Sequence, residues 1–485
     1  MIRVRIPPSP TGLLHIGTVR TALYNYLFAK HGDEDGPGTM VFRIEDTDKE
    51  RSTKEYEEDI INGLMALGIA GDEGVHISGD KGYRQSERTD IYTTNLKKLL
   101  DEDKAYYCDC TKERLEEMKN AQRVKKLAPR YDGACADKKL TEGVIRLRIP
   151  DDRGEIKWND LVRGETVIHA RELDDFVIAR SIDDPLYHLT VVADDHDMKI
   201  THVIRGEDHI SNTPKQILLF EAFEWEVPEF AHLPLILNED KSKLSKRKNK
   251  VSIDDYLADG YLPEALLNFL ALLGWNTPDE QEIFSMEELV EKFSLDRVHK
   301  GGAVFDIKKL DWINGEYIKK MIAEDIDGFY EMAKVFIVGK VPSEDEALIK
   351  KILQDPDFEG RFKKLSDIPE GLAPLFAELP DYPMDLIARE KFQITPEMLK
   401  NVMNKSIEVV NEMDWEKGDS DQNQAISEAF IGIVESLGLK NGQVLWPIRV
   451  ALSGLERSPN FATLAVYLGR KEVLKRLQIA LEKVS

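Results

Sequence analysis

The stretch Ile2-Arg-Val-Arg-Ile-Pro-Pro-Ser-Pro-Thr-Gly-Leu-Leu-His-Ile-Gly17 decides how the fold begins. Residues 2–6 alternate between apolar and charged side chains, which predicts a strand, and the proline-rich segment behind them predicts a tight loop. From about His15 the apolar residues recur with a helical period, and glycines at 32–38 end that helix before a second predicted strand, Met40–Ile44. This β-α-β order indicates a parallel sheet, in which ligands bind at the carboxyl ends of the strands.

The chain beyond this unit divides into an α/β part and a helical part. Short strands at 143–150, 166–169 and 175–179 and a charged helix near 112–126 predict an α+β insertion. Parallel strands are expected to resume at Leu189–Ala193 and Ile200–Ile204, with a turn at Asp194–Asp197 between them. Amphipathic helices are predicted at 262–273, 285–293, 424–437 and 459–483. The predicted fold is a multi-domain chain with a Rossmann-like α/β N-terminal half, split by the insertion, and an all-α C-terminal half.

Composition excludes several classes of protein. A chain of 485 residues exceeds a single hydrophobic core and suggests about three to five domains. No segment approaches the roughly 20 apolar residues that span a bilayer, and the N-terminus lacks the apolar region of a secretory signal, so we expect a cytoplasmic protein with no membrane partner. The net charge of −23 argues against a protein that coats nucleic acid by charge alone. An RNA partner would require a local basic patch.

Two distant segments together indicate phosphate chemistry. His15 and Gly17 lie where the first strand turns into a helix, a place that offers backbone N–H groups and a positive dipole end to phosphate. The basic run 241–250 contains Lys243 and Lys246, whose ammonium groups could neutralise a leaving pyrophosphate. Taken separately, each segment has a plain structural explanation, namely a helix N-terminal histidine and a solvated lysine-rich loop.

These segments resemble the HIGH and KMSKS signatures of class I aminoacyl-tRNA synthetases, here His15-Ile-Gly-Thr18 and Lys243-Leu-Ser-Lys-Arg247. Thr18 and Arg247 depart from the signatures, which puts their own phosphate contacts in doubt. Further segments extend the resemblance to the bacterial-type glutamyl-tRNA synthetases along the whole chain. They are Arg5-Ile-Pro-Pro-Ser-Pro-Thr-Gly12, Arg43-Ile-Glu-Asp-Thr-Asp48, Tyr187-His188, Val203-Ile-Arg-Gly-Glu-Asp-His209 and Ser211-Asn-Thr-Pro214.

The resemblance implies a glutamate-tRNA ligase, in which L-glutamate reacts with ATP, bound with Mg²⁺, before transfer to tRNA-Glu. By resemblance the glutamate site comprises Arg5 with Tyr187 for the side-chain carboxylate, Arg205 for the α-carboxylate, and Glu45 with Ser9 for the ammonium. His15, Lys243 and Lys246 would be the catalytic residues, and the ATP site would comprise Thr11, Gly12, His15, Gly17, Lys243, Ser245 and Lys246. Arg43 is expected to form an ion pair with Glu45 or Asp46, outside this site.

The three cysteines of the chain all lie in the predicted insertion, at Cys108, Cys110 and Cys135. Cys-x-Cys suits tetrahedral Zn²⁺, and related enzymes can carry a structural zinc in this insertion. By resemblance Tyr131 would be the fourth ligand, because the histidine that other relatives use is replaced here by Asp137. The alternative is a small subdomain with three free or oxidised thiols.

The resemblance also implies a division into domains and an anticodon site. Its domains would be a Rossmann-like catalytic domain at 1–104 and 187–254, an acceptor-binding insertion at 105–186, a stem-contact domain at 255–322 and an anticodon-binding region at 323–485. Anticodon contacts would come from Arg361, Arg449, Ser458, Pro459 and Phe461. A solvated helix face explains any one of these arginines equally well. A monomer is usual for the family.

Four alternatives stay open at this level. A glutaminyl-tRNA synthetase is disfavoured by the helical C-terminal half, and a shortened relative that glutamylates a modified tRNA base is disfavoured by length. A non-catalytic RNA-binding or regulatory paralogue would have lost His15 or the lysine loop, both of which are present. An adenylyltransferase unrelated to tRNA would not need the helical half. The sequence does not decide between charging of tRNA-Glu alone and charging of tRNA-Gln as well.

Overall fold

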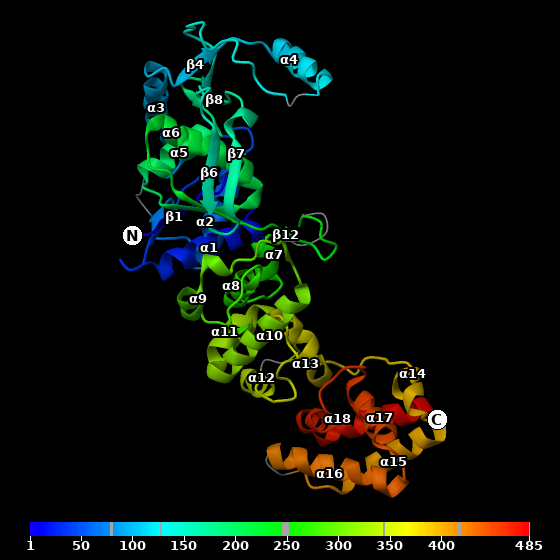
Figure 1. Ribbon diagram of the computed structural model, residues 1–485. Coiled ribbons are helices and arrows are strands. Elements are labelled where there is room, and N and C mark those ends of the chain that lie inside the picture. Colours follow the sequence, from blue (N-terminus) through cyan, green and yellow to red (C-terminus); the bar gives the residue numbers. More distant parts are fainter. Residues whose placement is uncertain (78–80, 127–128, 245–251, 343–344, 416–418, 485) are drawn as a thin grey trace. The chain divides into compact units, whose positions relative to one another are not determined.

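In the computed structural model, strand β1 (Arg3–Ile6), helix α1 (Ile16–His31) and strand β2 (Thr39–Phe42) form the predicted β-α-β unit (Figure 1). The strands are parallel and in register from Arg3 opposite Thr39 to Ile6 opposite Phe42. Helix α1 begins after His15, whose backbone is extended and whose side chain accepts a hydrogen bond from the Thr18 N–H. It ends at Gly32, whose φ of 75° favours glycine.

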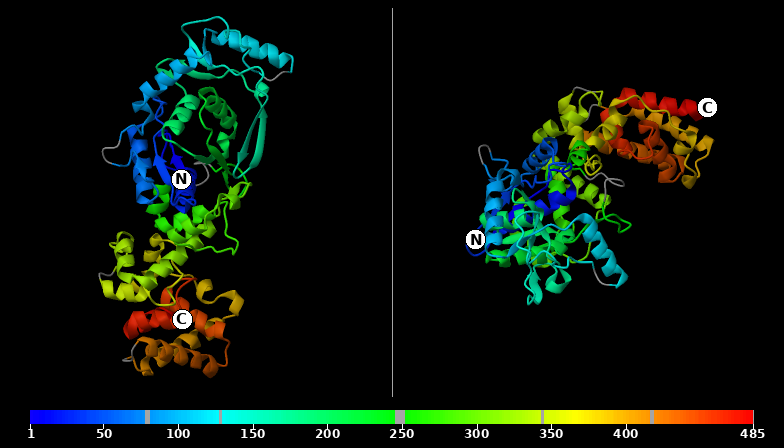
Figure 2. Two further views of the ribbon diagram at one scale, coloured as in Figure 1. Left: turned by 60° about the vertical axis from the view of Figure 1, so that its left-hand side comes forward. Right: turned by 90° about the horizontal axis from the view of Figure 1, so that it is seen from above.

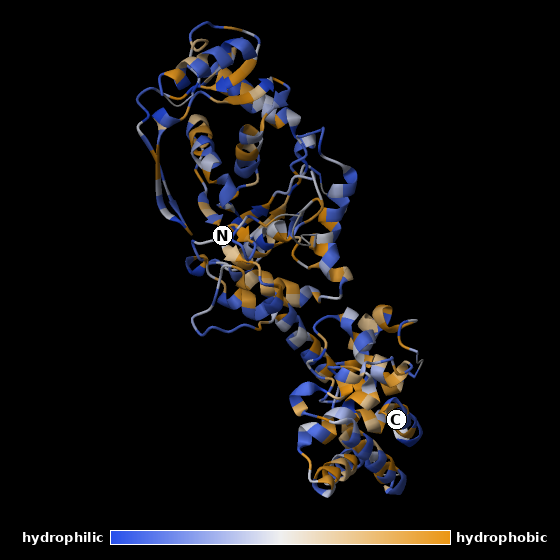
Figure 3. Cartoon of the chain, turned by 90° about the vertical axis from the view of Figure 1, so that its right-hand side faces the viewer, coloured by the Kyte–Doolittle hydropathy of each residue, from blue (hydrophilic) through white to orange (hydrophobic). Residues whose placement is uncertain are grey.

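The structure describes residues 1–77, 81–126, 129–244, 252–342, 345–415 and 419–484. Within them, residues 1–258 and 263–313 form one compact unit, and 259–262 with 314–484 form a second. Apolar residues concentrate inside each unit (Figure 3). In the described ranges no helix combines the length and the low polarity required to cross a membrane. The finer division into four domains stays a prediction.

A parallel sheet is the centre of the first unit. Strand β3 (Glu73–Gly74) pairs with β2, and β10 (His202–Gly206) lies beside β1, where the Thr201 N–H donates to the Arg3 carbonyl. Strand β11 (Glu229–Leu233) pairs in parallel with β10. The other elements of this part are α2 (Lys54–Ala66), α3 (Thr89–Asp101), η1 (Gln85–Glu87), η3 (Glu207–Asn212), α6 (Thr213–Phe223) and β12 (Ile236–Leu237). The Rossmann-like parallel sheet is therefore confirmed.

The prediction of a strand at Leu189–Ala193 and a turn at Asp194–Asp197 is wrong. Both segments belong to helix α5 (Tyr187–Asp197). Seven consecutive residues, 189–195, are buried, so this helix shows no amphipathic period and its apolar run has the appearance of a buried strand. The acidic residues that suggest a turn are buried instead: Asp194 pairs with Arg88, and Asp195 pairs with Arg43. The neighbouring prediction, a strand at Ile200–Ile204, is confirmed by β10.

The insertion has the expected α+β character. Its antiparallel sheet comprises β4 (Ala105–Cys108), β5 (Val144–Leu147), β8 (Val177–Ser181) and β9 (Asp184–Pro185). Its helices are α4 (Lys112–Val124) and η2 (Ala170–Glu172). A hairpin of β6 (Glu155–Asp160) and β7 (Gly164–His169) extends from the insertion to the parallel sheet, where Asp160 pairs with Phe230 of β11 (Figures 1 and 2). The hairpin thus brings an insertion residue to the sheet edge.

The remaining elements are almost all helical, as predicted. The first unit ends with α7 (Ile253–Ala258), α8 (Pro263–Leu272), α9 (Met286–Lys292), η4 (Leu295–Arg297) and β13 (Ala303–Val304). Helix α10 (Ile307–Glu324) follows. The second unit contains α11 (Ile326–Ile337), α12 (Glu346–Leu353), η5 (Leu365–Asp367), α13 (Ile368–Phe376), α14 (Met384–Ile387), η6 (Glu390–Phe392), α15 (Pro396–Glu412), α16 (Asp419–Leu437), α17 (Asn441–Ser453) and α18 (Phe461–Val484). Its core is formed mainly by α15 to α18.

Candidate active site

A cavity of about 490 Å³ opens in the first unit where β1 and β10 end. Eight residues predicted for the glutamate site, the ATP site or catalysis line it: Arg5, Ser9, His15, Gly17, Glu45, Tyr187, Arg205 and Lys243. Thr11 and Gly12 are not among the lining residues. Ser245 and Lys246, together with Arg247, lie outside the described residues. The chain fold therefore brings residues from position 5 to position 243 to one cavity at the expected sheet edge.

Arg5 is a buried guanidinium with an incomplete set of partners. Its side chain is only 2% exposed, and its Nε lies 3.3 Å from Oδ1 of Asp195. Its Nη1 atom has no hydrogen-bond partner within the described part of the chain, although Arg5 lines the cavity. Leaving a buried donor unpaired costs about 1–3 kcal/mol, so this N–H is a strong candidate for a ligand contact.

Arg205, at the end of β10, shows the same pattern. Its Nη2 donates to Thr213 Oγ1 at 2.8 Å, and its Nε points to a ring nitrogen of His232 at 3.2 Å. Over the ranges that the structure covers, its Nη1 has no partner. Burial lowers the pKa of Arg205 to about 10, so the guanidinium is still charged at neutral pH and lacks a counter-ion. Arg20 also lines the cavity; its Nη atoms donate to the carbonyls of Leu273 and Pro234, and its Nε is unpaired within the described residues. Three buried guanidinium groups thus line one cavity, and Arg5 and Arg205 differ from Arg20 because their unpaired nitrogen is Nη1.

Arg43 differs from these two arginines in its carboxylate partners and its position outside the cavity lining, although its Nε also has no hydrogen-bond partner within the described residues. Its Nη1 lies 2.6 Å from Asp195, and its Nη2 lies 3.5 Å from Glu45. Arg43 does not line the cavity. Its predicted ion pair with Glu45 is present, and the alternative pair with Asp46 is not formed. Asp46 instead accepts hydrogen bonds from the N–H and hydroxyl groups of Ser86.

Glu45 is one of two acidic residues that line the cavity, with Asp208, and is 7% exposed. Burial raises its pKa to about 7, although Arg43 and Arg5 favour the charged form. A bound ammonium group would restore the carboxylate. The cavity therefore contains, besides its cationic residues, a buried acid whose charge a bound cation would stabilise.

Tyr187 starts helix α5, and its hydroxyl lies 3.2 Å from Nδ1 of His209. Burial raises the pKa of Tyr187 to about 12, so the hydroxyl keeps its proton at neutral pH and can donate a hydrogen bond. His209 belongs to the Val203–His209 segment that resembles the family, but the sequence predicts no role for it. Its contact with Tyr187 places it beside the cavity, which it also lines.

His15 caps helix α1, with its two ring nitrogens 3.3 Å from the Thr18 backbone N and 3.2 Å from the Thr18 hydroxyl. A side chain at Gly17 would bring a Cβ to 3.1 Å from that ring, which explains why glycine suits this position. Lys243 lies on the same cavity and approaches Asp208 at 3.7 Å. A histidine, a helix N-terminus and a lysine therefore meet where phosphate binding was expected.

Sequence reasoning missed the acid that holds Arg5. Asp195 contacts both Arg5 and Arg43, and it is 2% exposed. The available signal was the run of acids at 194–197 next to an apolar segment, which we interpreted as a turn. Two buried arginines require buried acids, and that requirement could have suggested a different assignment.

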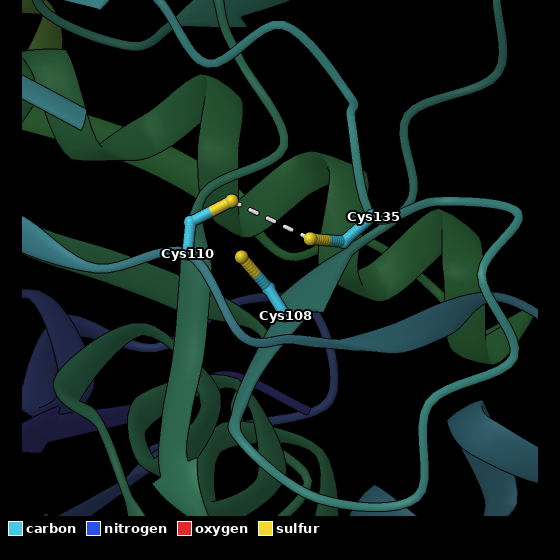
Figure 4. A group of neighbouring side chains, drawn as sticks. All are labelled: Cys108, Cys110 and Cys135. Carbon is cyan, nitrogen blue, oxygen red and sulfur yellow. Dashed lines mark hydrogen bonds between the residues drawn. The ribbon is translucent and has the colours of Figure 1, made fainter. Parts of the chain in front are cut away.

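The three cysteines converge in the insertion (Figure 4). Their sulfur atoms all lie within 4.8 Å of one another, and the Tyr131 hydroxyl lies 3.4 Å from Cys108 and 3.5 Å from Cys110. A tetrahedral zinc with Zn–S bonds of about 2.3 Å separates its sulfur ligands by about 3.8 Å. Burial would raise the pKa of Cys108, but hydrogen bonding to Tyr131 and Arg146 outweighs it and lowers that pKa to about 7. The donor set therefore fits zinc.

Two acids near the cysteines differ in position. Asp137 is 95% exposed and pairs with Arg148, so it is directed away from the thiols. Asp109, which was not predicted as a ligand, lies 3.1 Å from the sulfur of Cys135. Asp109 is therefore an alternative to Tyr131 as the fourth ligand, which would supply an oxygen atom beside the three sulfurs.

The predicted anticodon residues fall into two groups in the second unit. Arg449 donates to the Ser458 hydroxyl at 2.8 Å, and Arg361 donates to the Ser458 carbonyl at 2.8 Å. Pro459 is buried, and Phe461 is 7% exposed and packs against Phe430. The structure brings the first three residues together and places Phe461 in the helical core.

Comparisons with known proteins cover the whole chain. A family model described as "tRNA synthetases class I (E and Q), catalytic domain" matches residues 1–312, and an "Anticodon binding domain" matches 328–481. The chain is 40% identical to the glutamate-tRNA ligase of Natranaerobius thermophilus over 99% of both chains, and 41% identical to that of Carboxydothermus hydrogenoformans over 98% and 99%. A crystal structure of a glutamate tRNA ligase from Elizabethkingia meningosepticum, in complex with its amino acid, covers 100% of both chains with a TM-score of 0.85 and 33% identity.

Proposed function

The chain belongs to the glutamate-tRNA ligases of the class I aminoacyl-tRNA synthetases, and we propose that the cavity at β1 and β10 is where it activates L-glutamate. Members of this family use ATP with Mg²⁺ to activate the amino acid and then transfer it to tRNA. The observation that carries the assignment is the pair of buried arginines, Arg5 and Arg205, each with one unpaired N–H group at the cavity.

Glutamate matches this arrangement group by group. It carries two carboxylates and one ammonium, and among the charged residues that line the cavity Arg5 and Arg205 can take the carboxylates and Glu45 the ammonium. Arg20, Lys243 and Asp208 also line the cavity and are not needed for these three contacts. In the proposed arrangement Arg5 and Tyr187 hold the side-chain carboxylate, and Arg205 holds the α-carboxylate. Glu45, helped by Ser9, holds the ammonium, and this contact returns Glu45 to its charged form.

Discrimination against glutamine follows from the same geometry. A neutral amide opposite Arg5 would leave the guanidinium buried without its second counter-ion. By analogy with broken buried charge pairs, that loss costs about 2–5 kcal/mol. Arg5 would therefore set the preference for glutamate over glutamine, in agreement with the glutamate-specific names of the relatives.

The proposed chemical step needs no protein nucleophile. An oxygen of the α-carboxylate attacks the α-phosphorus of ATP, an O–P bond forms to give glutamyl-adenylate, and the bond to the β-phosphate breaks to release pyrophosphate. Mg²⁺ bound with the nucleotide neutralises part of the phosphate charge. His15 at the helix N-terminus and Lys243 would stabilise the charge that develops on the phosphates, with Lys246 as a further lysine outside the described residues. A ribose hydroxyl at the tRNA 3′ end then takes the glutamyl group and releases AMP.

We further propose a structural Zn²⁺ held by Cys108, Cys110, Cys135 and Tyr131. The support is the convergence of three thiols and one hydroxyl in a small module with few other core residues. A zinc ion at this position would link the segment that contains Cys108 and Cys110 to the segment that contains Tyr131 and Cys135. Metal analysis of the purified protein tests this: about one zinc per chain is expected, and its loss in Cys110→Ser but not in Asp137→Ala would support the ligand set. Retention in Tyr131→Phe with loss in Asp109→Ala would transfer the fourth position to Asp109.

The tRNA would contact two parts of the chain. In this proposal the insertion at 105–186 receives the acceptor end, and Arg361, Arg449, Ser458, Pro459 and Phe461 contact the anticodon. The support is stronger for the two arginines, which are exposed or partly exposed, than for Ser458, Pro459 and Phe461, which are buried. The domain boundaries, a monomeric state, a cytoplasmic location and the choice between tRNA-Glu and tRNA-Gln stand as predictions.

Pyrophosphate release tests the proposed function directly. It would be measured from ATP with glutamate or glutamine, each without tRNA, with tRNA-Glu transcript and with tRNA-Gln transcript. We expect release with glutamate that depends on tRNA-Glu, and release with tRNA-Gln as well would reveal an enzyme that accepts both tRNAs. Release with glutamine alone would overturn the glutamate assignment, and no release under any condition would favour the non-catalytic paralogue.

A further inference from the structure

A chain of three buried polar residues stands behind the cavity. Asp160, at the end of β6, and His232, in β11, are 1% and 0% exposed. Nδ1 of His232 lies 2.5 Å from Oδ2 of Asp160, and Nε2 of the same ring lies 3.2 Å from Nε of Arg205. The two inner residues are 72 positions apart in the sequence and meet because the β6–β7 hairpin joins the edge of the parallel sheet.

The direction of these hydrogen bonds follows from their donors. Arginine Nε carries a hydrogen and cannot accept, so Nε2 of His232 must be the acceptor. The proton of the neutral ring therefore resides on Nδ1, which donates it to Asp160. The Thr213 hydroxyl is 3.1 Å from the same Nε2 and accepts from Nη2 of Arg205, so it can donate to the ring as well. A protonated His232 would direct an N–H at the arginine and break this arrangement.

The surroundings keep His232 neutral and Asp160 charged. Burial lowers the pKa of His232. Burial opposes the charge on Asp160, but hydrogen bonds from His232 and from backbone N–H groups outweigh it and lower the pKa of Asp160. Oδ1 of Asp160 accepts from the backbone N–H groups of Val162, Arg163 and His232. The carboxylate is therefore fixed at both oxygen atoms.

This arrangement differs from an ordinary ion pair. Arg43, nearby, contacts Asp195 and Glu45 directly and takes no part in lining the cavity. Among the described residues Arg205 has no carboxylate as a direct partner, because an imidazole stands between its guanidinium and Asp160. The inner side of Arg205 is thus anchored at Nε and Nη2, while its charge and its Nη1 stay available to the cavity.

We propose that Asp160 and His232 are positioning residues that orient Arg205 toward the α-carboxylate of glutamate without neutralising it. The proposal rests on the proposed role of Arg205. Its physical content is the tautomer of His232: Asp160 selects the ring form whose Nε2 accepts, and that form alone is compatible with the Arg205 contact. Because Asp160 belongs to the insertion hairpin, the insertion contributes a residue to amino acid recognition.

Asp160→Asn is the decisive variant, because it preserves shape and the contacts at Oδ1 but places an amide N–H₂ opposite Nδ1. The ring then shifts to the other tautomer, and its Nε2–H opposes the Arg205 N–H. We expect the KM for glutamate in aminoacylation to rise on the order of tenfold to a hundredfold, the range that one unpaired buried group produces. The KM for ATP should stay within about twofold, because Asp160 and His232 act on Arg205, which is proposed to bind glutamate and not ATP.

His232→Gln supplies the second arm. Its amide oxygen can accept from Arg205 in place of Nε2 while its N–H₂ group donates to Asp160, so this variant should keep most of the affinity for glutamate. Asp160→Asn added to His232→Gln would oppose two N–H₂ groups and turn the glutamine amide, so the KM for glutamate should rise again by about tenfold to a hundredfold. The shape-changing His232→Gln should thus have a smaller effect than the near-isosteric Asp160→Asn, the reverse of what a loss of packing predicts.

A buried control separates positioning from stability. Asn268→Asp is a similar near-isosteric change at a fully buried residue that donates to Glu282 and accepts from Phe284, and Asn268 does not line the cavity. It should lower the melting temperature and leave the KM for glutamate unchanged. The proposal is overturned if Asp160→Asn leaves the KM for glutamate unchanged, raises both KM values in parallel, or raises the KM for glutamate no more than His232→Gln does. If the wild-type enzyme charges glutamate but Arg205→Ala keeps a normal KM for glutamate, the role of Arg205 fails while the proposed enzyme activity stands.

Discussion

Buried arginines occur in both units of the protein, and they are bonded differently. Arg476, in the helical unit, is 2% exposed, and its Nε, Nη1 and Nη2 donate to Glu472, to the carbonyls of Pro374 and Leu452, and to the carbonyl of Ala377. Arg5 and Arg205, in the α/β unit, are as deeply buried but each leaves Nη1 unpaired within the described residues. A fully bonded arginine stabilises a fold, whereas an incompletely bonded one beside a cavity indicates a ligand.

Truncation of the cavity arginines is the strongest way to break this comparison. In Arg205→Ala and Arg5→Ala we expect kcat/KM for glutamate to fall by about 10²–10³, the effect of removing one partner of a buried charge pair. The melting temperature should fall less than in a substitution of Arg476, because Asp195 keeps Arg43 as a partner and Nε2 of His232 keeps the Thr213 hydroxyl. Aminoacylation kinetics and thermal unfolding measure the two quantities. An intact kcat/KM in both variants would remove the cavity from the account.

Arg476→Met is the counterpart in the helical unit. It leaves four acceptors unpaired, of which the carbonyls of Pro374 and Leu452 are buried, so we expect a loss of about 2–4 kcal/mol in the free energy of unfolding. Denaturant unfolding measures it, and kcat/KM for glutamate should be unchanged for the folded fraction. A variant that unfolds normally but binds glutamate poorly would contradict the division between structural and ligand arginines.

The pH dependence of glutamate binding tests the role of Glu45, the acid proposed to bind the substrate ammonium. Burial raises the pKa of Glu45 to about 7, and a protonated carboxyl cannot pair with the substrate ammonium. The KM for glutamate should therefore rise as the pH falls through about 7, by at most about tenfold per pH unit. The same raised pKa means that the folded state holds a proton which the unfolded state has lost, so Glu45 stabilises the fold less as the pH rises from about 4.5 to 7. Glu45→Gln should abolish both trends, and a KM independent of pH in the wild type would exclude this role.

Substitution of Arg449, in the helical unit, is expected to have the smallest effect, a change in the KM for tRNA. Arg449 is stacked on Trp446 with its guanidinium carbon 4.6 Å from the ring centroid, and it bonds to Ser458. If it contacts the anticodon, Arg449→Ala should raise the KM for tRNA about threefold to tenfold and leave the KM for glutamate unchanged. Arg449→Lys, which keeps the charge but loses the planar fork, should recover only part of the affinity. An unchanged KM for tRNA in both variants would place Arg449 with the structural arginines.

The sequence predicted the elements that have a clear period and missed those that are buried on all sides. The β-α-β unit and the C-terminal helices follow from alternation and helical spacing. Helix α5 does not, because its residues 189–195 are all buried and an apolar run of that kind fits a strand equally well.

The candidate site was predictable only as far as linear motifs reach. Arg5, Glu45 and Arg205 stand in segments that can be recognised alone, and they do meet at one cavity. The contacts that hold them, Asp195 on Arg5 and His232 on Arg205, depend on strands and helices that are distant in sequence. Only the folded chain brings such partners together, so no spacing rule could reveal them.

The most direct test of the central claim is a crystal structure with L-glutamate bound. The account predicts the side-chain carboxylate on Nη1 of Arg5, the α-carboxylate on Nη1 of Arg205 and the ammonium on Glu45. Glutamate bound outside this cavity, or bound within it with both arginine Nη1 atoms still unpaired, would contradict the account.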